Sequence, residues 1–174
     1  MQLDPRRTGS PPQRIEPTGF FSGIKIRPII VGVVVDYIAT YAGMYAYFFG
    51  YLAKELSKEG EISSDTIAEY MMTTEGLLIG FAIGALGTAI GGFVAARKAG
   101  QLEIKHGGLV GFCSLIISFI EGAMREEGVP LPDWFRLLSV LAIVPAGMLG
   151  GYVAEMFKGI GGSYRASNDK WPRT

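Results

Sequence analysis

The sequence predicts an all-α membrane protein in which four antiparallel transmembrane helices pack through stripes of glycine, alanine and serine. Three observations lead to this fold class. Four apolar stretches each have about the 20 residues that an α-helix needs to cross a bilayer core. Small residues recur inside these stretches at helical spacing. Basic residues are concentrated in the segments that lie on one side of the predicted bilayer.

The four predicted spans are long apolar segments within a bundle of residues 28–157. A helix on the surface of a soluble protein carries polar residues at every third or fourth position, and these segments do not. Because the connectors between them are short, neighbouring helices are expected to run antiparallel. The expected spans cover about residues 29–53, 74–97, 106–124 and 134–157.

The parts of the chain outside the spans complete the predicted organisation. Residues 1–27 are expected to form a largely disordered N-terminal tail and residues 158–174 a C-terminal tail that is disordered from residue 160, because these segments are polar and rich in Pro, Gly, Ser and Arg. The longest connector, residues 54–73, contains SSDTIAEYMM, in which Ser63 or Ser64 is a suitable helix N-cap. This connector is expected to hold a short helix that either extends the second span or lies on the membrane surface.

The charge distribution predicts the orientation of the bundle. Twelve of the 16 Lys and Arg residues fall in the two tails and in the connector between the second and third spans. The opposite side holds the other four, together with nine acidic residues. By the positive-inside rule, both termini are expected to be cytoplasmic, in a multi-pass protein of the cell (inner) membrane. Four spans agree with this, because an even number of crossings returns the chain to the side where it began.

The second span carries the clearest stripe of small residues. Gly80, Gly84, Gly87 and Gly91 follow one another at spacings of 4, 3 and 4, which places them on one helix face and forms two G-x-x-x-G pairs. In lipid, a missing side chain lets two helix backbones approach closely, and this offsets the poor helix propensity of glycine in water. The spacing leaves open whether these faces meet one another or a second protein. Glycines expected to pack in the same way on the other spans are Gly32, Gly43, Gly107, Gly111, Gly147, Gly150 and Gly151.

Three glycine-rich segments carry a family resemblance. These are GGFVAARKAG at the end of the second span, KHGGLVGF at the start of the third and GMLGGYVAEM in the fourth. Together they resemble the uncharacterised four-helix, glycine-rich integral membrane proteins of bacteria and archaea. The resemblance covers about residues 74–157 and does not extend to the N-terminal tail or the first span. It implies a fold and a membrane location, and no known activity.

Asp36 is the most informative polar residue inside a predicted span. It lies about 10 Å from the cytoplasmic edge of the hydrocarbon region, at about 1.5 Å per residue. An aspartate at the centre of a membrane helix costs about 3 kcal/mol, so Asp36 is expected to face the bundle, to be protonated or to have a partner. Two interpretations are open: a proton- or cation-binding site, or a structural group that hydrogen-bonds Thr40, a tyrosine or a neighbouring backbone. The sequence alone favours the structural interpretation.

Glu121 is the second polar candidate inside a span. It lies near the outer end of the third span, and Arg125 follows four residues later, which is the spacing of an ion pair on a helix. An ion pair at the membrane interface is the favoured interpretation. Glu121 is expected to lie about 12 Å higher across the bilayer than Asp36, so no direct pair between them is expected.

The sequence offers little support for catalysis. It shows no nucleophile–base pair, phosphate-binding loop or metal-ligand cluster. A metal site needs several ligands, and the chain has one histidine, His106, and one cysteine, Cys113. His106 is expected to make a capping or headgroup contact, and Cys113 to fill space as a small buried residue. We therefore expect no enzyme, no catalytic residue, no cofactor, no metal and no nucleic-acid partner.

Two non-catalytic functions follow. The favoured one is an accessory or packing subunit of a larger membrane complex, or a homo-oligomer, whose partners are the lipid bilayer and other membrane-protein subunits or further copies of the chain. The alternative is a small transporter or channel with Asp36 as its proton- or cation-coupling carboxylate. In outline this alternative is similar to the small multidrug transporters, which have four short helices and one acidic residue in the first. The likeness ends there, because this chain has longer tails and its glycine stripes are placed differently.

Overall fold

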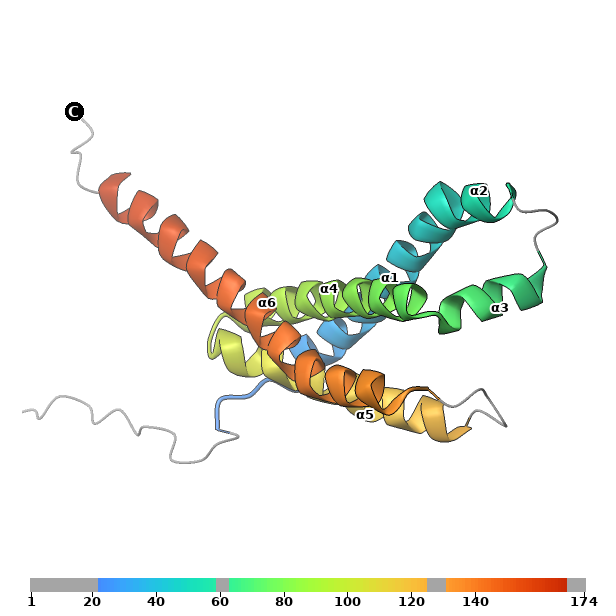
Figure 1. Cartoon of the computed structure of the whole chain (residues 1–174). Coiled ribbons are helices and arrows are strands. Elements are labelled where there is room, and N and C mark those ends of the chain that lie inside the picture. The colour runs from blue at the N-terminus through green and yellow to red at the C-terminus, as the bar shows by residue number, and fades with distance from the viewer. Residues whose placement is uncertain (1–21, 59–62, 125–130, 169–174) are drawn as a thin grey trace, which may run out of the picture.

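The computed structural model describes residues 22–58, 63–124 and 131–168, and every regular element in these ranges is helical (Figure 1). A long first helix, α1, continues into a π-helix and a short α2, and a second short helix, α3, precedes three long helices. The bounds are α1 Ile26–Tyr47, the π-helix Phe48–Leu52, α2 Ala53–Leu56, α3 Ser64–Met72, α4 Thr74–Ala99, α5 Glu103–Met124 and α6 Asp133–Asn168.

Within the described residues, four segments are long and apolar enough to cross a membrane, which confirms the predicted all-helical class with four candidate spans. Their length and composition are those of a multi-pass membrane protein. These segments are Ile26–Leu52, Thr74–Ala99, Glu103–Met124 and Asp133–Gly159.

The ends of three helices differ from the sequence prediction, and one of them is α5, which begins at Glu103 rather than at about residue 106. The first helix begins at Ile26 rather than at about residue 29. Pro28 is compatible with this start because it lies in the first turn, where a backbone N–H has no acceptor within the helix, so proline loses no hydrogen bond there. The last helix continues to Asn168 rather than ending at about residue 157. The glycine and serine residues of this stretch had suggested a tail. The helix can nevertheless continue, because no proline interrupts its hydrogen bonding between Pro145 and Pro172. The remaining parts of both predicted tails lie outside the described residues.

The short helix expected in the longest connector is α3, and it is distinct from the second span. Ser63 is its N-cap, and its hydroxyl accepts the backbone N–H of Thr66 at 3.1 Å. The extended residue Thr73 separates α3 from α4 and caps α4. The hydroxyls of Tyr70 on α3 and Tyr47 at the end of α1 hydrogen-bond at 2.6 Å. Desolvation, followed by this hydrogen bond, raises the pKa of the Tyr70 phenol.

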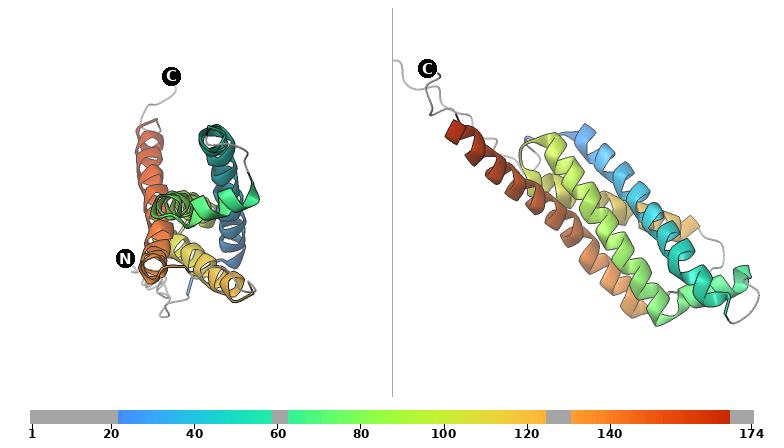
Figure 2. Two further views of the ribbon diagram at one scale, coloured as in Figure 1. Left: turned by 45° about the vertical axis from the view of Figure 1, so that its right-hand side comes forward. Right: turned by 90° about the horizontal axis from the view of Figure 1, so that it is seen from above.

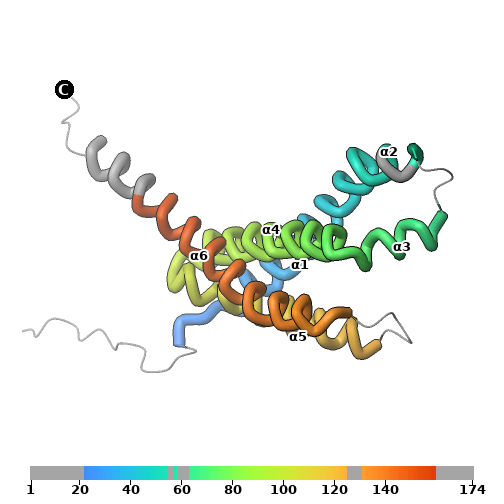
Figure 3. The backbone as a smooth tube through the Cα atoms, viewed as in Figure 1, coloured from blue at the N-terminus to red at the C-terminus, as the bar shows by residue number. Residues whose placement is uncertain are grey.

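The long helices form a bundle in which α4 contacts α1, α5 and α6. The view along α4 shows α1 and α6 on its two sides and α5 beneath it (Figure 2). The bundle has two different ends. The closed end holds the α4–α5 connector around Gly100, and the open end holds Leu52, Thr74 and Met124. The backbone trace shows α1 and α5 diverging toward the open end (Figure 3).

Toward the closed end, helix backbones meet at glycines. A Cβ atom added to Gly107 would collide with the backbone of Gly147 and Gly151, and one added to Gly92 would collide with Gly147. Gly150 lies in the same way against the backbone of α4. Helices can approach this closely only where a side chain is absent. The predicted packing glycines that have the backbone of another helix within 3.0 Å of such a Cβ are Gly32, Gly91, Gly107, Gly111, Gly147, Gly150 and Gly151.

Toward the open end, the glycine stripe of α4 makes fewer contacts with neighbouring helices. A Cβ atom added to Gly43 would still lie 2.7 Å from a side chain of α4. At Gly80 and Gly84, however, it would meet nothing within 4 Å. The sequence left open whether this face meets another helix of the chain or a second protein, and at these two positions no other described helix of the chain comes within 4 Å of such a Cβ. The helical spacing of the glycines continues along α4, but no neighbouring helix comes as close at Gly80 and Gly84 as at Gly91.

Lysine side chains cap the closed end. Gly100, at φ 68°, ends α4 in the left-handed conformation that glycine adopts readily. Lys25 Nζ donates to the carbonyl of Ala99 at 2.9 Å, and Lys158 Nζ donates to that of Gly100 at 2.8 Å. Both cations lie at the negative end of the α4 dipole. Lys158 also pairs with Glu103 at 2.7 Å and so ties α6 to α5.

His106 completes this end of the bundle. It is fully buried, and the backbone N–H of Lys25 donates to its Nε2 at 3.0 Å. Because Nε2 accepts, Nδ1 carries the ring hydrogen and donates to the carbonyl of Leu102 at 3.0 Å. The histidine thus joins the start of α1 to α5 by backbone contacts, which is the capping role that the sequence suggested.

Candidate functional site: a polar cavity around Asp36

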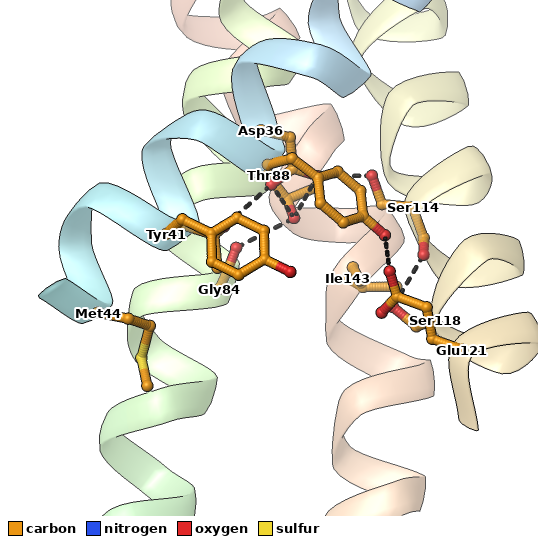
Figure 4. Close-up of a pocket in the computed structure, with 11 residues that line it drawn as sticks. Asp36, Tyr41, Met44, Gly84, Thr88, Ser114, Ser118, Glu121 and Ile143 are labelled. Carbon is orange, nitrogen blue, oxygen red and sulfur yellow. Dashed lines mark hydrogen bonds between the residues drawn. The ribbon is translucent and has the colours of Figure 1, made fainter. Parts of the chain in front are cut away.

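Asp36 lies inside the bundle, only 4% exposed, where three helices supply hydroxyl groups to its carboxylate (Figure 4). Thr40, one turn further along α1, donates to Oδ1 at 3.3 Å. Thr88 of α4 donates to Oδ1 at 3.2 Å and to Oδ2 at 3.1 Å. Ser114 of α5 donates to Oδ2 at 2.5 Å. Thr40 was one of the partners expected from the sequence, and the other two come from distant parts of the chain.

Glycines on α4 allow the carboxylate to reach Thr88. A Cβ atom added to Gly91 would lie 2.8 Å from the Cβ of Asp36, and one added to Gly87 would lie 3.1 Å from Asp36 Oδ1. Side chains at either position would displace the aspartate from α4. The packing glycines and the polar site are therefore parts of one arrangement, in which the absence of a side chain on α4 makes room for the side chain of Asp36.

The Thr88 hydroxyl has two competing acceptors. Its oxygen lies 3.1 Å from the carbonyl oxygen of Gly84, one turn earlier on α4, and within 3.2 Å of both carboxylate oxygens. A hydroxyl has one hydrogen to donate. When Asp36 is ionised, Thr88 can donate to it. When Asp36 carries a proton, Asp36 can donate to Thr88 while Thr88 donates to Gly84, so both protonation states leave the buried oxygens hydrogen-bonded.

A cavity of about 220 Å³ adjoins this carboxylate and extends toward the open end. Glu121 of α5 also lines it and accepts a hydrogen bond from the Tyr37 hydroxyl at 3.2 Å (Figure 4). Among the described residues that line the cavity, none is Lys, Arg or His. The full lining is Asp36, Tyr37, Thr40, Tyr41, Met44, Gly84, Thr88, Ser114, Ser118, Glu121 and Ile143.

The structure brings together the two carboxyl groups that the sequence singled out. Asp36 and Glu121 share one cavity, and Tyr37, the neighbour of Asp36, bridges to Glu121. The sequence predicted no direct pair between them, and the hydrogen bonds found in the described residues include none. The expected partner of Glu121, Arg125, lies outside the described residues. The phenol of Tyr37 is instead a partner that helical spacing within α5 does not reveal.

The remaining candidates for chemistry do not join this site. The described residues contain no group of three or more His, Cys, Asp or Glu side chains arranged to hold a metal ion. Cys113 is a free, half-buried thiol. His106 is committed to backbone contacts at the closed end. The site is therefore a set of oxygen atoms around one buried carboxylate.

Sequence reasoning identified Asp36 and Glu121 and missed the role of Thr88 and Ser114. Ser114 lies three residues after Gly111, so its position continues the face of the packing glycines and by itself indicates packing. Thr88 directly follows Gly87. A hydroxyl beside a packing glycine on a membrane helix could have indicated a hydrogen bond to a neighbouring helix. Membrane helices often use such hydroxyls to hydrogen-bond across an interface.

Comparison with known proteins adds no family: no family model, curated protein or solved structure matches this chain. The resemblance over residues 74–157 stays a prediction. The function is therefore argued from the residues around Asp36.

Proposed function

We propose that this chain is a small, non-catalytic membrane transporter or channel in which Asp36 binds and releases a proton or a monovalent cation. The observation that carries the proposal is a buried carboxylate that has only hydroxyl partners and opens onto a cavity without basic residues. An ionised carboxylate is costly in an apolar bundle unless it is compensated. Because no cationic side chain lines this cavity, a proton or a bound cation is the natural compensation.

The surroundings of Asp36 suit either ion. A proton is accommodated by the rearrangement of the Thr88 hydrogen bond described above. A small hard cation prefers oxygen ligands, and the hydroxyls of Thr40, Thr88 and Ser114 turn their lone pairs toward the ion when it binds beside the carboxylate. Release leads into the cavity, where Glu121 is the next acidic group. The sequence alone favoured a structural role for Asp36, and the shared cavity is what shifts the preference toward an ion site.

Flux measurements in proteoliposomes test this proposal. The wild-type protein is expected to dissipate an imposed proton or sodium gradient, and Asp36→Asn is expected to lose this flux while remaining folded. Asp65→Asn is the matched control, because this exposed acid lies on α3 outside the spans and should leave flux unchanged. The proposal fails if wild type shows no flux of either ion, or if Asp36→Asn transports as well as wild type.

A second proposal is the accessory subunit or homo-oligomer that the sequence favoured. It is supported by the unfilled space at Gly80, where α4 has a small residue and nothing lies within 4 Å of an added Cβ atom. A partner helix on this side of α4 restores the close packing that the spacing suggests. Purification of the native protein in mild detergent tests it: a stoichiometric larger complex supports a subunit role, and a lone protomer contradicts it.

We also propose that the four spans run antiparallel, pack through their glycine stripes and leave both termini in the cytoplasm. The glycine contacts support the directions, because Gly107 and Gly111 of α5 meet successively earlier residues of α6. The excess of basic residues at the closed end supports the orientation. Cysteine labelling of intact cells, with Cys113 replaced, tests it. A cysteine at position 65 should react from outside and one at position 101 should not, and the reverse result rejects the orientation.

A further inference from the structure

The closed end of the bundle carries positive charge that the described residues do not neutralise. Among these residues, six cationic and two acidic side chains lie at this end. Of the two acids, Glu103 is paired with Lys158, and Glu155 forms no ion pair within the described part of the chain. A surface with such an excess of one charge attracts the opposite charge. The six cationic residues are Lys25, Arg27, Arg97, Lys98, Lys105 and Lys158.

Arg97, in the last turn of α4, is available to bind an anion. The last carbonyls of this helix already accept hydrogen bonds from Lys25 and Lys158, so its negative end is capped without Arg97. Within the described residues, the guanidinium of Arg97 has neither a carboxylate partner nor a hydrogen-bond acceptor. Because an arginine carries five N–H donors, Arg97 keeps all of them for a group outside the described chain.

An aromatic pair fixes the position of this guanidinium. Arg97 Cζ lies 5.6 Å from the ring centroid of Phe93, one turn earlier on α4, and an aromatic face attracts a cation at this distance. Phe93 meets Phe157 of α6 edge to face, with centroids 6.2 Å apart. Beside this pair, Gly150 of α6 lies against the backbone of α4. Two closely packed helices therefore place the donors of Arg97 over one aromatic surface.

The face of α4 that leads to Arg97 is apolar and exposed. Leu86, Ile90, Phe93 and Arg97 follow one another at spacings of 4, 3 and 4, which places them on one side of the helix. Leu86 and Ile90 are exposed large apolar side chains. Arg97 lies near the closed-end terminus of the candidate span Thr74–Ala99. This face thus offers an apolar track within the bilayer and a cation at the level of the lipid headgroups.

From this geometry we propose that the α4–α6 face binds an anionic phospholipid, with the phosphate on the guanidinium of Arg97 and an acyl chain along Leu86 and Ile90. Arginine matches a phosphate with two parallel N–H···O bonds. Lys98, the next residue, adds attraction for a headgroup with net negative charge. A zwitterionic headgroup gains less, because its own cation offsets the phosphate. The inference goes beyond ion movement through Asp36 and does not depend on it.

Native mass spectrometry of the full chain in detergent tests the inference. The probes are dioleoylphosphatidylglycerol and dioleoylphosphatidylcholine, which share acyl chains and differ in net charge. We expect the first phosphatidylglycerol to bind more tightly than phosphatidylcholine. Arg97→Gln should weaken phosphatidylglycerol binding about tenfold, since a hydrogen bond to a charged group is worth about this factor. Equal binding of the two lipids to wild type, or unchanged binding in Arg97→Gln, overturns the inference.

A matched control separates a defined site from general attraction to a basic surface. Arg27 is also an exposed arginine at the closed end, but it belongs to α1, which lies on the other side of α4 from α6 (Figure 2). Arg27→Gln should leave the affinity for the first phosphatidylglycerol unchanged. A loss as large as that in Arg97→Gln overturns the site, because the lipid would then respond only to total charge.

The contribution of the acyl chain is tested with a soluble headgroup. Glycerol 3-phosphate presents a phosphate without acyl chains, so it should bind far more weakly than phosphatidylglycerol and should not displace it at equal concentration. Equal affinity of the two compounds, lost together in Arg97→Gln, would overturn the lipid as occupant and identify a site for a soluble phosphate.

Discussion

The two ends of the bundle differ in how closely their helices pack. At the closed end, glycines of α4, α5 and α6 bring backbones into contact, His106 is fully buried, and lysines cap the end of α4. At the open end, α1 and α5 diverge (Figure 3), and there are two cavities, one lined largely by polar residues and the other largely by aromatic ones. Asp36 lies at the transition between them. Close backbone packing at one end and divergent helices at the other thus coexist in one bundle, with the buried carboxylate between them.

The largest effect is expected from adding a methyl group at the closed end. In Gly150→Ala the new Cβ would collide with the backbone of α4, which cannot move as a side chain can. Overpacking of this kind costs about 1–3 kcal/mol. Gly80→Ala adds the same methyl group where nothing lies within 4 Å, so it should be close to neutral. Unfolding in detergent measures both, and equal destabilisation contradicts the contrast between the two ends.

Substitutions of Asp36 should have the next largest effect. Asp36→Leu removes the acceptor for the hydroxyl of Ser114 at a buried site, whereas Thr88 can still donate to the carbonyl of Gly84. Leaving buried polar groups without partners costs about 1–3 kcal/mol. Asp36→Asn keeps one carbonyl acceptor and should cost less. The same detergent unfolding experiment compares them, and an Asn variant as unstable as the Leu variant contradicts the hydrogen-bonding geometry.

Removing the hydroxyl of Tyr70 should loosen α3 at the open end. Tyr70→Phe loses the hydrogen bond to Tyr47, worth about 0.5–1.5 kcal/mol. In wild type this stabilisation is complete below the ordinary tyrosine pKa of 10.0 and is lost as the pH rises above it, because folding raises the pKa of Tyr70. Hydrogen exchange of the α3 amides, compared between wild type and Tyr70→Phe, measures the change. The prediction is contradicted if the variant exchanges no faster than wild type in α3, or if its exchange rises more in α5 than in α3.

The smallest effect is expected for Lys158 at the closed end, whose side chain is 58% exposed although its partner Glu103 is buried. Solvent reaches the lysine side of this pair, so its contribution is expected to stay near the value for surface ion pairs, about 0–1 kcal/mol. Lys158→Met should therefore change stability only slightly, and the difference from wild type should shrink at high salt. A loss comparable to that of Gly150→Ala would mean that this lysine, rather than the glycines, holds the closed end together.

The sequence predicted what depends on local composition. Apolar length located the four spans, and the polar residue within one of them identified Asp36. Thr40 was predictable as its partner because the two are one helical turn apart. Thr88 and Ser114 were not, because their contacts with Asp36 depend on how three helices cross. For the same reason the spacing of glycines along α4 did not reveal that Gly91 meets another backbone and Gly80 does not.

The central claim is that Asp36 changes its protonation or ion occupancy, and infrared difference spectroscopy of the protein in nanodiscs tests it most directly. The account predicts a carboxylic acid C=O band that appears and disappears as pH or sodium concentration is varied, and that is absent in Asp36→Asn. Asp65→Asn should retain it. A carboxyl group of Asp36 that stays in one state across these conditions would contradict the account and return Asp36 to a purely structural role.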